Sequence, residues 1–247
     1  MTTRPHPLGD DADVLGPDDV VRVVTLDGPA GSGKSTVARA VARALGLAYV
    51  DSGATYRAVT LAVLRAGVAL DDVDRVREVA LAADVALVTD ADAPRVLLDG
   101  EDVTAEVRGP EVTAAVSAVS AVPEVRARLV QVQRRAMVVG SVAEGRDVGT
   151  AVAPSAVVKV FLDADPQVRA ARRAGDADAG VRSTGPDLVG AVAADLARRD
   201  ALDSGRAASP TRAADDAVHL DSSALSVDEV VARVLALAAA AGLAPSS

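Results

Sequence analysis

The chain has 247 residues, of which 50% are hydrophobic and 1% are aromatic, and its formal net charge is −9. A chain of this length can bury a substantial core as one domain, built here mainly from Val, Leu and Ala. An acidic chain lacks the broad positive field with which proteins bind nucleic-acid polymers, so we expect no such partner. The lack of cysteine excludes disulfides, thiolate catalysis and cysteine-ligated metals, and it is compatible with a reducing cytoplasm.

The two ends of the chain show no membrane signal. Residues 1–19 are rich in Pro, Gly and Asp without an apolar segment behind a basic start, so we expect a disordered extension, neither a signal peptide nor a membrane anchor. Residues 20–247 are predicted to form a single domain. The apolar stretch 230–241 is too short to span a bilayer and contains Arg233. It is expected to form a packed terminal helix.

The first predicted element is a short β-branched strand over residues 20–27, followed by a glycine-rich loop and a helix over residues 34–45 that ends at Gly46. The loop sequence GPAGSGKS matches the complete pattern G-x-x-x-x-G-K-[ST]. Its glycines let consecutive backbone N–H groups turn inward at a helix N-terminus, where they bind a polyphosphate. A chance match is the alternative, but the flanking strand and helix favour a phosphate-binding loop.

Two side chains of this loop have separate expected roles. Lys34 is one of only two lysines among 26 basic residues, so a strong preference for arginine is overridden here. Its ammonium group would reach the β and γ phosphates of a nucleotide. The hydroxyl group of Ser35 would enter the coordination shell of Mg²⁺, which prefers oxygen ligands.

A second strand over residues 47–50 and a helix over residues 53–65 come next, and alternating strands and helices predict a parallel sheet. The sequence DSGATYR spans their junction and puts Tyr56 and Arg57 one turn into the helix. An arginine at this edge can bind a second phosphate. The alternative is a helix cap by Asp51 with a packed tyrosine, and capping and binding can coexist.

The alternation of strands and helices is interrupted after this helix. Two short strands and two helices are predicted, at residues 85–88, 95–98, 110–122 and 123–137. The strands are separated by polar residues and followed by the turn signal Asp99-Gly100. This pattern predicts an antiparallel insertion at about residues 68–137.

Parallel strands are expected again at residues 138–143 and 157–162, each ending in charged residues. After the first of them, the sequence EGRDVGT brackets Arg146 and Asp147 with two glycines, which indicates a backbone shaped around a ligand. An arginine beside an aspartate can hold a phosphate and a base amino group. The alternative is a surface ion pair on a turn, which contributes little to stability.

The last third of the chain contains a candidate lid. Residues 174–186 include three glycines and little apolar sequence, and arginine-bearing helices flank them. A mobile loop that excludes water from phosphates fits this pattern, with a passive linker as the alternative. A final strand is expected at residues 217–221, before a helix that Ser226 caps with Glu229 in a capping box.

Five motifs, in order along the chain, resemble those of the bacterial cytidylate kinase family of P-loop nucleoside monophosphate kinases: GPAGSGKST, DSGATYR, EGRDVGT, VKVFLDAD and RRDALDSGR. The resemblance begins at about residue 21 and extends to the C-terminus. It implies an α/β P-loop kinase fold with a parallel core sheet flanked by helices, an inserted nucleotide-monophosphate-binding lobe and a short lid. It also implies a monomeric cytoplasmic enzyme that uses Mg²⁺ and transfers the γ-phosphoryl group of ATP to CMP or dCMP.

The resemblance assigns roles to residues by their position in these motifs. ATP would be bound by Gly28, Pro29, Ala30, Gly31, Ser32, Gly33, Lys34, Ser35 and Thr36, with Ser35 as a metal ligand. CMP would be bound by Ser52, Tyr56, Arg57, Ser117, Arg126, Arg146, Asp147, Arg199 and Asp203. The residues implied in catalysis are Lys34, Arg146, Arg172, Arg173, Arg199 and Arg206.

The implied cytosine contacts are chemically sensible. Cytosine offers an amino group that Asp147 can accept from, and a ring nitrogen and a carbonyl that Arg126 and Ser117 can donate to. One departure from the family is Glu144, which stands where an aspartate is common and changes only the reach of the carboxylate.

Two alternative functions stay open at this point. Another P-loop kinase, acting on a different nucleotide or small metabolite, would share the donor loop and differ around the base contacts. A non-catalytic regulator would bind a nucleotide without transferring phosphate. The acceptor motif at Tyr56 and Arg57, together with the absence of an N-K-x-D motif, argues against the regulator.

Overall fold

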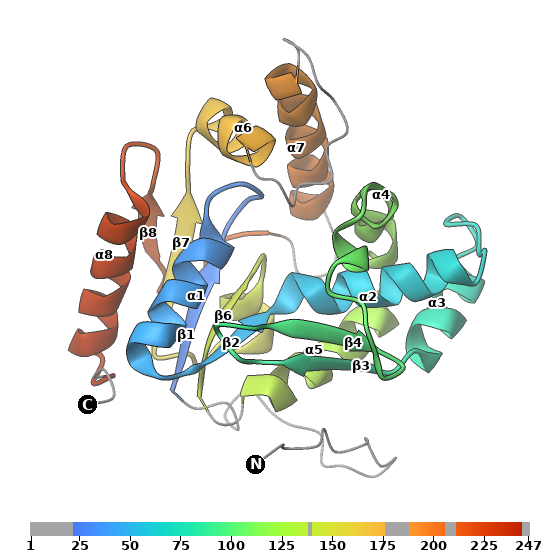
Figure 1. Ribbon diagram of the computed structural model, residues 1–247, viewed down its shortest axis with the longest axis horizontal. Helices are drawn as coiled ribbons and strands as arrows, with labels where there is room; N and C mark the ends of the chain where they lie inside the picture. The colour runs from blue at the N-terminus through green and yellow to red at the C-terminus, as the bar shows by residue number, and fades with distance from the viewer. Residues whose placement is uncertain (1–21, 138–139, 176–187, 206–210, 244–247) are drawn as a thin grey trace.

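The protein was analysed as a computed structural model, which describes residues 22–137, 140–175, 188–205 and 211–243 (Figure 1). A parallel sheet of five strands has the order β2-β6-β1-β7-β8. The strands are β1 (Val23–Asp27), β2 (Ala48–Asp51), β6 (Ser141–Gly145), β7 (Val158–Asp163) and β8 (Val218–Asp221). The chain first adds strands on one side of β1 and then on the other, so the order reverses beside β1, where ligands bind in open α/β sheets. The predicted α/β fold with a parallel core sheet is confirmed.

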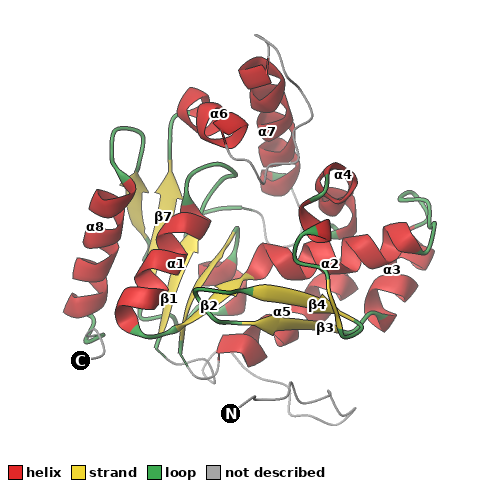
Figure 2. Cartoon of the chain, in the orientation of Figure 1, coloured by secondary structure: helices red, strands yellow, loops and turns green. Residues whose placement is uncertain are grey.

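Helices cover both faces of this sheet (Figure 2). On one face, α1 (Lys34–Leu45) packs beside α8 (Val227–Ala240). Buried residues of α1 recur at helical spacing, as at Val37, Val41 and Leu45, and meet Val24 and Leu26 of β1. On the other face lies α5 (Pro123–Met137), whose Met137 packs on Val23. Because β1 is covered on both faces, all its residues are buried, as is usual for central parallel strands.

The segment between β2 and α5 forms a second layer with its own small sheet. Its elements are α2 (Ser52–Arg65), α3 (Val73–Ala82), β3 (Val85–Val88), β4 (Arg95–Leu98), β5 (Glu101–Asp102), η2 (Glu106–Arg108) and α4 (Pro110–Val119). Strands β3, β4 and β5 are antiparallel, as expected from the sequence. Their apolar side chains form one core with α2, for example through Val59, Val96 and Leu98.

Some predicted bounds differ from the structure. The strand expected at residues 138–143 runs from Ser141 to Gly145, because Gly140 adopts a left-handed turn with φ of 88° and the pairing with β1 continues to Gly145. The helix expected to reach residue 122 ends at Val119, because the N–H groups of Ala121 and Val122 bond only three residues back, in a turn before α5. Helix α3, capped by Asp72, was not predicted.

Two further helices stand beyond the carboxyl edge of the sheet. Helix α6 (Pro166–Gly175) follows β7 and packs against α7 (Leu188–Ser204) (Figure 1). The predicted extension at residues 1–19, and residues 176–186 of the predicted lid, lie outside the described residues. Within the described ranges, the structure contains no helix with the length and apolar character needed to cross a membrane.

Candidate active site

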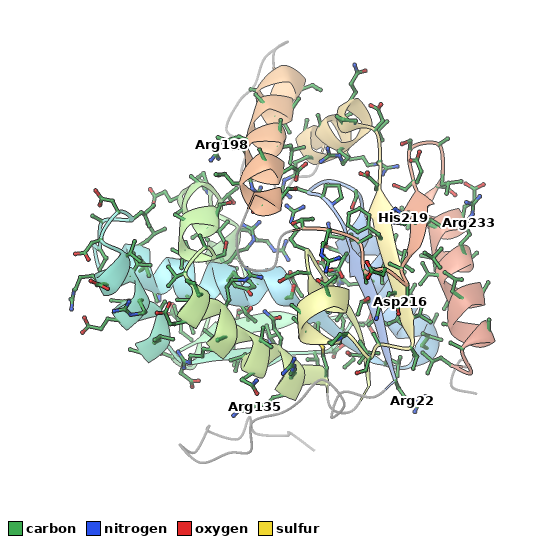
Figure 3. The ribbon with its side chains drawn as sticks, turned by 180° about the vertical axis from the view of Figure 1, so that it is seen from behind. Arg22, Arg135, Arg198, Asp216, His219 and Arg233 are labelled. Atoms are coloured by element: carbon green, nitrogen blue, oxygen red, sulfur yellow. The ribbon has the colours of Figure 1, made fainter. Side chains whose placement is uncertain are left out.

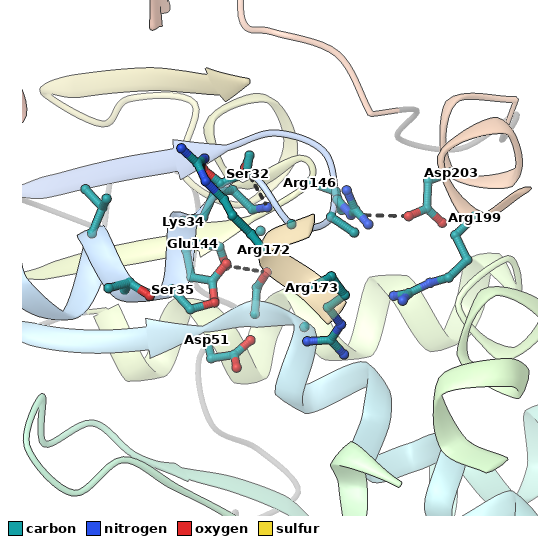
Figure 4. Close-up of a pocket in the computed structure, with 18 of the residues that line it drawn as sticks. Ser32, Lys34, Ser35, Asp51, Glu144, Arg146, Arg172, Arg173, Arg199 and Asp203 are labelled. Atoms are coloured by element: carbon teal, nitrogen blue, oxygen red, sulfur yellow. Dashed lines mark hydrogen bonds and ion pairs between the residues drawn. The ribbon is translucent and has the colours of Figure 1, made fainter. Parts of the chain in front are cut away.

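A cavity of about 620 Å³ opens at the carboxyl edge of the parallel sheet. It is lined on one side by residues 30–36 of the phosphate-binding loop. The other side is lined by residues of α2, α4, α5, α7 and the β6 loop, which we define as residues 145–152. In Figure 4, Arg146 lies between Lys34 on the loop side and Asp203 on the α7 side. The topology therefore joins the donor loop and the second polar motif in one cavity.

The phosphate-binding loop has the backbone that its glycines predict. Gly28, Gly31 and Gly33 have φ angles of 145°, 77° and 93°, which residues with a Cβ atom rarely adopt. Gly33 is the N-cap of α1 and makes no side-chain cap, so the N–H groups of the first helical turn point to the cavity. A Cβ atom at Gly28 would lie 2.1 Å from the carbonyl oxygen of Leu162. The loop is thus held tightly against β7.

Substitution of Gly28 by alanine is expected to lower the free energy of unfolding by about 3 kcal/mol, since it adds a clash with backbone to an unfavourable φ. Urea unfolding measures the change. Gly175→Ala is the matched control, because a Cβ atom there meets nothing within 4 Å, and it should be neutral or stabilise by up to about 1 kcal/mol. Equal stabilities of the two variants would contradict the prediction.

The ammonium group of Lys34 is buried against the loop itself. Its Nζ donates to the carbonyl oxygen of Pro29 at 2.7 Å and to the hydroxyl of Ser32 at 3.5 Å. Burial, and then the positive charge of Arg146, lower the pKa of Lys34 to about 8. An anionic ligand in the cavity would offset both effects. The lysine is therefore placed where a polyphosphate stabilises its charge.

Oxygen atoms gather beside the lysine at the start of α1. Ser35 donates its hydroxyl hydrogen to Oε1 of Glu144 at 2.6 Å, and the hydroxyl of Tyr49 donates to the same oxygen at 3.2 Å. Burial and the nearby Asp51 raise the pKa of the Glu144 carboxyl. A hydroxyl and a carboxylate beside a phosphate site suit Mg²⁺, which usually takes few protein oxygens and fills its shell with phosphates and water.

The far side of the cavity holds a buried ion pair. Nη2 of Arg126, on α5, pairs with Oδ2 of Asp147, and each side chain is 6% exposed. The guanidinium carbon of Arg126 lies 5.2 Å from the centroid of the Tyr56 ring, within cation–π range. Arg126 also donates to the carbonyl oxygen of Ser120 at 3.2 Å. These contacts hold its guanidinium group in one orientation at the cavity wall, which the buried Ser117 also lines.

Several arginines converge between the ion pair and the loop. Arg57 donates to the hydroxyl of Thr113 at 3.1 Å. Burial, with a contribution from the charge of Arg199, lowers the pKa of Arg57 to about 10. Burial and the charge of Arg146 likewise lower the pKa of Arg199. Clustered cations repel one another, and a doubly charged phosphate monoester between them would relieve that repulsion.

Arg146 connects the phosphate-binding loop to α7. Its Nη1 donates to the carbonyl oxygen of Gly28 at 3.0 Å, and its Nε pairs with Asp203 at 3.2 Å. A second carboxylate, Asp200, lies 3.5 Å from Nη1 and 2.5 Å from Nη1 of Arg169 on α6. The guanidinium group is therefore held between the phosphate-binding loop and α7, which are far apart in the sequence.

Helix α6 has two neighbouring arginines at the cavity wall. Arg172 donates to the hydroxyl and the carbonyl oxygen of Ser222, at 2.9 and 2.7 Å, on the donor side of the cavity. Arg173 follows it in the sequence and also lines the cavity.

The predicted Arg206 lies outside the described residues. Arg198, beside Arg199 in the sequence, is on the exposed surface of α7, where it pairs with Asp195 (Figure 3).

The structure gives the two glycines around Arg146 and Asp147 a packing role, and their predicted relation to a ligand stays a prediction. A Cβ atom at Gly145 would lie 2.2 Å from the hydroxyl oxygen of Ser52, and one at Gly149 would lie 2.9 Å from that of Thr25. Protein atoms fill the space that side chains would need at these two positions. These glycines allow the β6 loop to pack closely on β1 and α2.

The cavity wall includes most of the predicted site residues. Within the described part of the chain, only Gly28 and Pro29 are set back from it, and they contribute carbonyl oxygens to Arg146 and Lys34. Further polar residues lie in or behind the wall and were not assigned a binding or catalytic role from the sequence: Asp27, Asp51, Arg108, Glu144, Arg169, Asp200 and Ser222. Three of them, Asp27, Asp51 and Glu144, were detectable as acidic residues near the carboxyl ends of parallel strands.

A parallel sheet with this strand order, a phosphate-binding loop after its central strand and a cationic pocket facing that loop define a P-loop kinase. The comparisons with known proteins agree: residues 24–240 match the family described as cytidylate kinase. The chain belongs to the cytidylate kinase family.

Individual relatives match over most of both chains. The cytidylate kinase of Rhodococcus opacus is 51% identical over 215 residues, which cover 86% of this chain and 93% of the relative. That of Mycolicibacterium paratuberculosis is 52% identical over 211 residues, covering 85% and 91%. That of Streptomyces avermitilis is 45% identical over 219 residues, covering 87% and 91%.

Proposed function

We infer that this protein is a cytidylate kinase that transfers the γ-phosphoryl group of ATP to CMP or dCMP and releases ADP with CDP or dCDP. Membership of the family supports the reaction. The observation that carries the inference for this chain is the buried Arg126–Asp147 pair, which faces the phosphate-binding loop across the same cavity. One end of the cavity thus suits a base with polar edges, and the other suits a polyphosphate.

Acceptor recognition would follow from the buried pair and the arginine cluster. The carboxylate of Asp147 would accept a hydrogen bond from the amino group of cytosine. Arg126 and Ser117 would donate hydrogen bonds to the ring nitrogen and the carbonyl oxygen of the base. Arg57 and Arg146 would grip the phosphate, for which the planar guanidinium group offers paired donors. On α7, Arg199 and Asp203 would hold the ribose or the phosphate, as would Ser52 on α2. All of these side chains line the same cavity, which supports the proposal.

Donor binding would use the backbone N–H groups of residues 30–36 and the ammonium group of Lys34. Ser35 and Glu144 would hold Mg²⁺, and when bound this ion would neutralise phosphate charge and orient the donor. The hydrogen bond between these two oxygens shows that both reach the same point at the start of α1. Arg172, at the Ser222 side, would attend the donor.

Transfer itself would depend on placement and charge. The phosphate monoester of the acceptor is largely ionised near neutral pH, with a second pKa of about 6, so no side chain needs to act as a base. Lys34 and the arginines would hold donor and acceptor in line and stabilise the charge that develops on the moving group. Arg173, on α6, would add positive charge to the site, and the resemblance assigns Arg206 the same role.

Four further properties remain predictions. The segment at about residues 68–137 would be the acceptor-binding lobe, since its α4 and α5 supply Ser117 and Arg126 to the cavity. Residues 174–186 would form the lid. We also propose that the enzyme acts as a monomer in the cytoplasm.

An ADP-release assay with a panel of acceptors tests the proposed function. CMP and dCMP are expected to be phosphorylated at least about 100-fold more efficiently than UMP, because UMP leaves the carboxylate of Asp147 facing a carbonyl oxygen. AMP and shikimate should be poor acceptors. Equal turnover of UMP and CMP would contradict the proposed base contacts, and ATP binding without transfer to any acceptor would support the regulator instead.

A further inference from the structure

Asp27 is a buried carboxylate that the proposed chemistry does not use. It is the last residue of β1, directly before the phosphate-binding loop, and is 5% exposed. Its Oδ1 accepts the backbone N–H of Val148 at 2.8 Å, and its Oδ2 accepts that of Gly149 at 2.7 Å. One side chain therefore ties the strand that leads into the donor loop to the segment that carries Arg146 and Asp147.

The close approach of these two segments depends on glycine. A Cβ atom at Gly149 would lie 3.2 Å from Oδ2 of Asp27 and 2.9 Å from the hydroxyl oxygen of Thr25. The same segment is fixed at its far end by Arg134 of α5, which donates to the carbonyl oxygens of Val152 and Ala151 at 2.8 and 3.2 Å. The β6 loop is thus held between β1 and α5.

The electrostatic environment shows that this carboxylate is costly to bury. Burial raises the pKa of Asp27 to about 6, and the negative charge of Asp147 acts in the same direction. The two backbone N–H bonds and the charge of Lys34 oppose that change. A buried carboxylate is tolerated only with such partners. Here the N–H groups belong to the β6 loop, and Lys34 belongs to the phosphate-binding loop.

We propose that Asp27 is a positioning residue for phosphoryl transfer, which sets the distance between the donor loop and Arg146. The inference rests on the proposed function, because it concerns the placement of CMP relative to ATP. Asp27 does not line the cavity. It would therefore affect the reaction indirectly, by holding the β6 loop and with it Arg146 in position. An error of about 1 Å in such placement can reduce the rate about 100-fold.

Asp27→Asn tests the proposal, since asparagine keeps the shape of the side chain but turns one acceptor into a donor. The side-chain NH2 group of asparagine would then face the backbone N–H of Val148 or Gly149. Because two donors cannot form a hydrogen bond, we expect the β6 loop to shift. The kcat is expected to fall about 10-fold to 100-fold, and the KM for CMP to rise, while the KM for ATP stays within about twofold. Steady-state kinetics with each substrate varied in turn separates these effects.

Thr25→Val is the matched control. Thr25 lies on the same strand, near the same glycine, and within the described structure its buried hydroxyl has no hydrogen-bond partner. Valine should leave kcat and both KM values unchanged. Gly149→Ala provides a second route to the same displacement if Asp27→Asn does not fold, and it should raise the KM for CMP selectively.

The possible outcomes separate the proposal from its alternatives. Lower thermal stability of Asp27→Asn with unchanged KM values and kcat per folded molecule would show a purely structural role and overturn the proposal. Equal increases in the KM for ATP and for CMP would also overturn it. If the unmodified protein does not phosphorylate CMP, the proposed function fails, independently of the behaviour of the variants.

Discussion

Replacement of Lys34 by methionine is expected to reduce kcat about 1,000-fold, the larger end of the effect of removing one group that stabilises transition-state charge. Lys34 supplies the ammonium group of the phosphate-binding loop, and the loop carbonyl of Pro29 holds it at the edge of the cavity. Methionine preserves the apolar stem and removes the charge. Steady-state kinetics with saturating ATP and CMP measures the loss.

The other lysine of the chain offers a matched control. Lys159 is also buried, but its Nζ binds Asp216 at 2.8 Å and the carbonyl oxygen of Pro154, outside the cavity wall (Figure 3 labels Asp216). Lys159→Met should lower stability and leave kcat within about threefold. Similar loss of kcat in both variants would mean that a buried lysine is needed only for the fold.

Replacement of Arg146 by alanine is expected to lower kcat/KM for CMP about 100-fold to 1,000-fold while ATP binding persists. Arg146 reaches from the β6 loop to the carbonyl oxygen of Gly28 and to Asp203, so it stands between the phosphate-binding loop and α7. Without it, the acceptor phosphate loses a bidentate donor and the moving phosphoryl group loses positive charge. Calorimetric titration with ATP and kinetics with CMP measure the two effects separately.

Arg198→Ala controls for loss of an arginine near the site. That side chain is exposed and pairs only weakly with Asp195 on the surface of α7, so both ATP binding and kcat/KM should be unchanged. If a folded Arg146→Ala protein lost ATP binding as strongly as it lost CMP turnover, the assignment of Arg146 to the acceptor would be wrong.

Local sequence patterns predicted the elements that carry their own signals. The helix at Lys34–Leu45 was predicted with the correct ends, because apolar spacing, the preceding glycines and Gly46 all act within one segment. The strands at Val85–Val88 and Arg95–Leu98 were also correct, since they are short apolar runs separated by polar residues, and a strong turn signal follows the second. The capping box of Ser226 and Glu229 is present. Each of these features depends on residues a few positions apart.

Features that depend on distant segments were predicted less well. The strand ending at Gly145 gains its last residues from pairing with β1, which lies more than one hundred positions away in the chain. The bonds between Ser35 and Glu144, and between Asp200 and Arg169, likewise join elements brought together only by the sheet and by α6–α7 packing. A sequence pattern can show that a residue is polar and lies near the end of a strand or helix. It does not show which strands and helices pack together in the folded protein.

The sequence by itself determined that residues 28–35 form a loop of the phosphate-binding type, because its nest of N–H groups is built from contiguous residues whose conformations glycine permits. Its motifs also determined the family. Only the tertiary structure decided that Arg126 pairs with Asp147, that Arg146 is shared by the donor loop and α7, and that the glycines of the β6 loop make room for Ser52 and Thr25. The physical reason is that charge pairing and close packing depend on distances in space, and the parallel sheet sets those distances after the chain has folded.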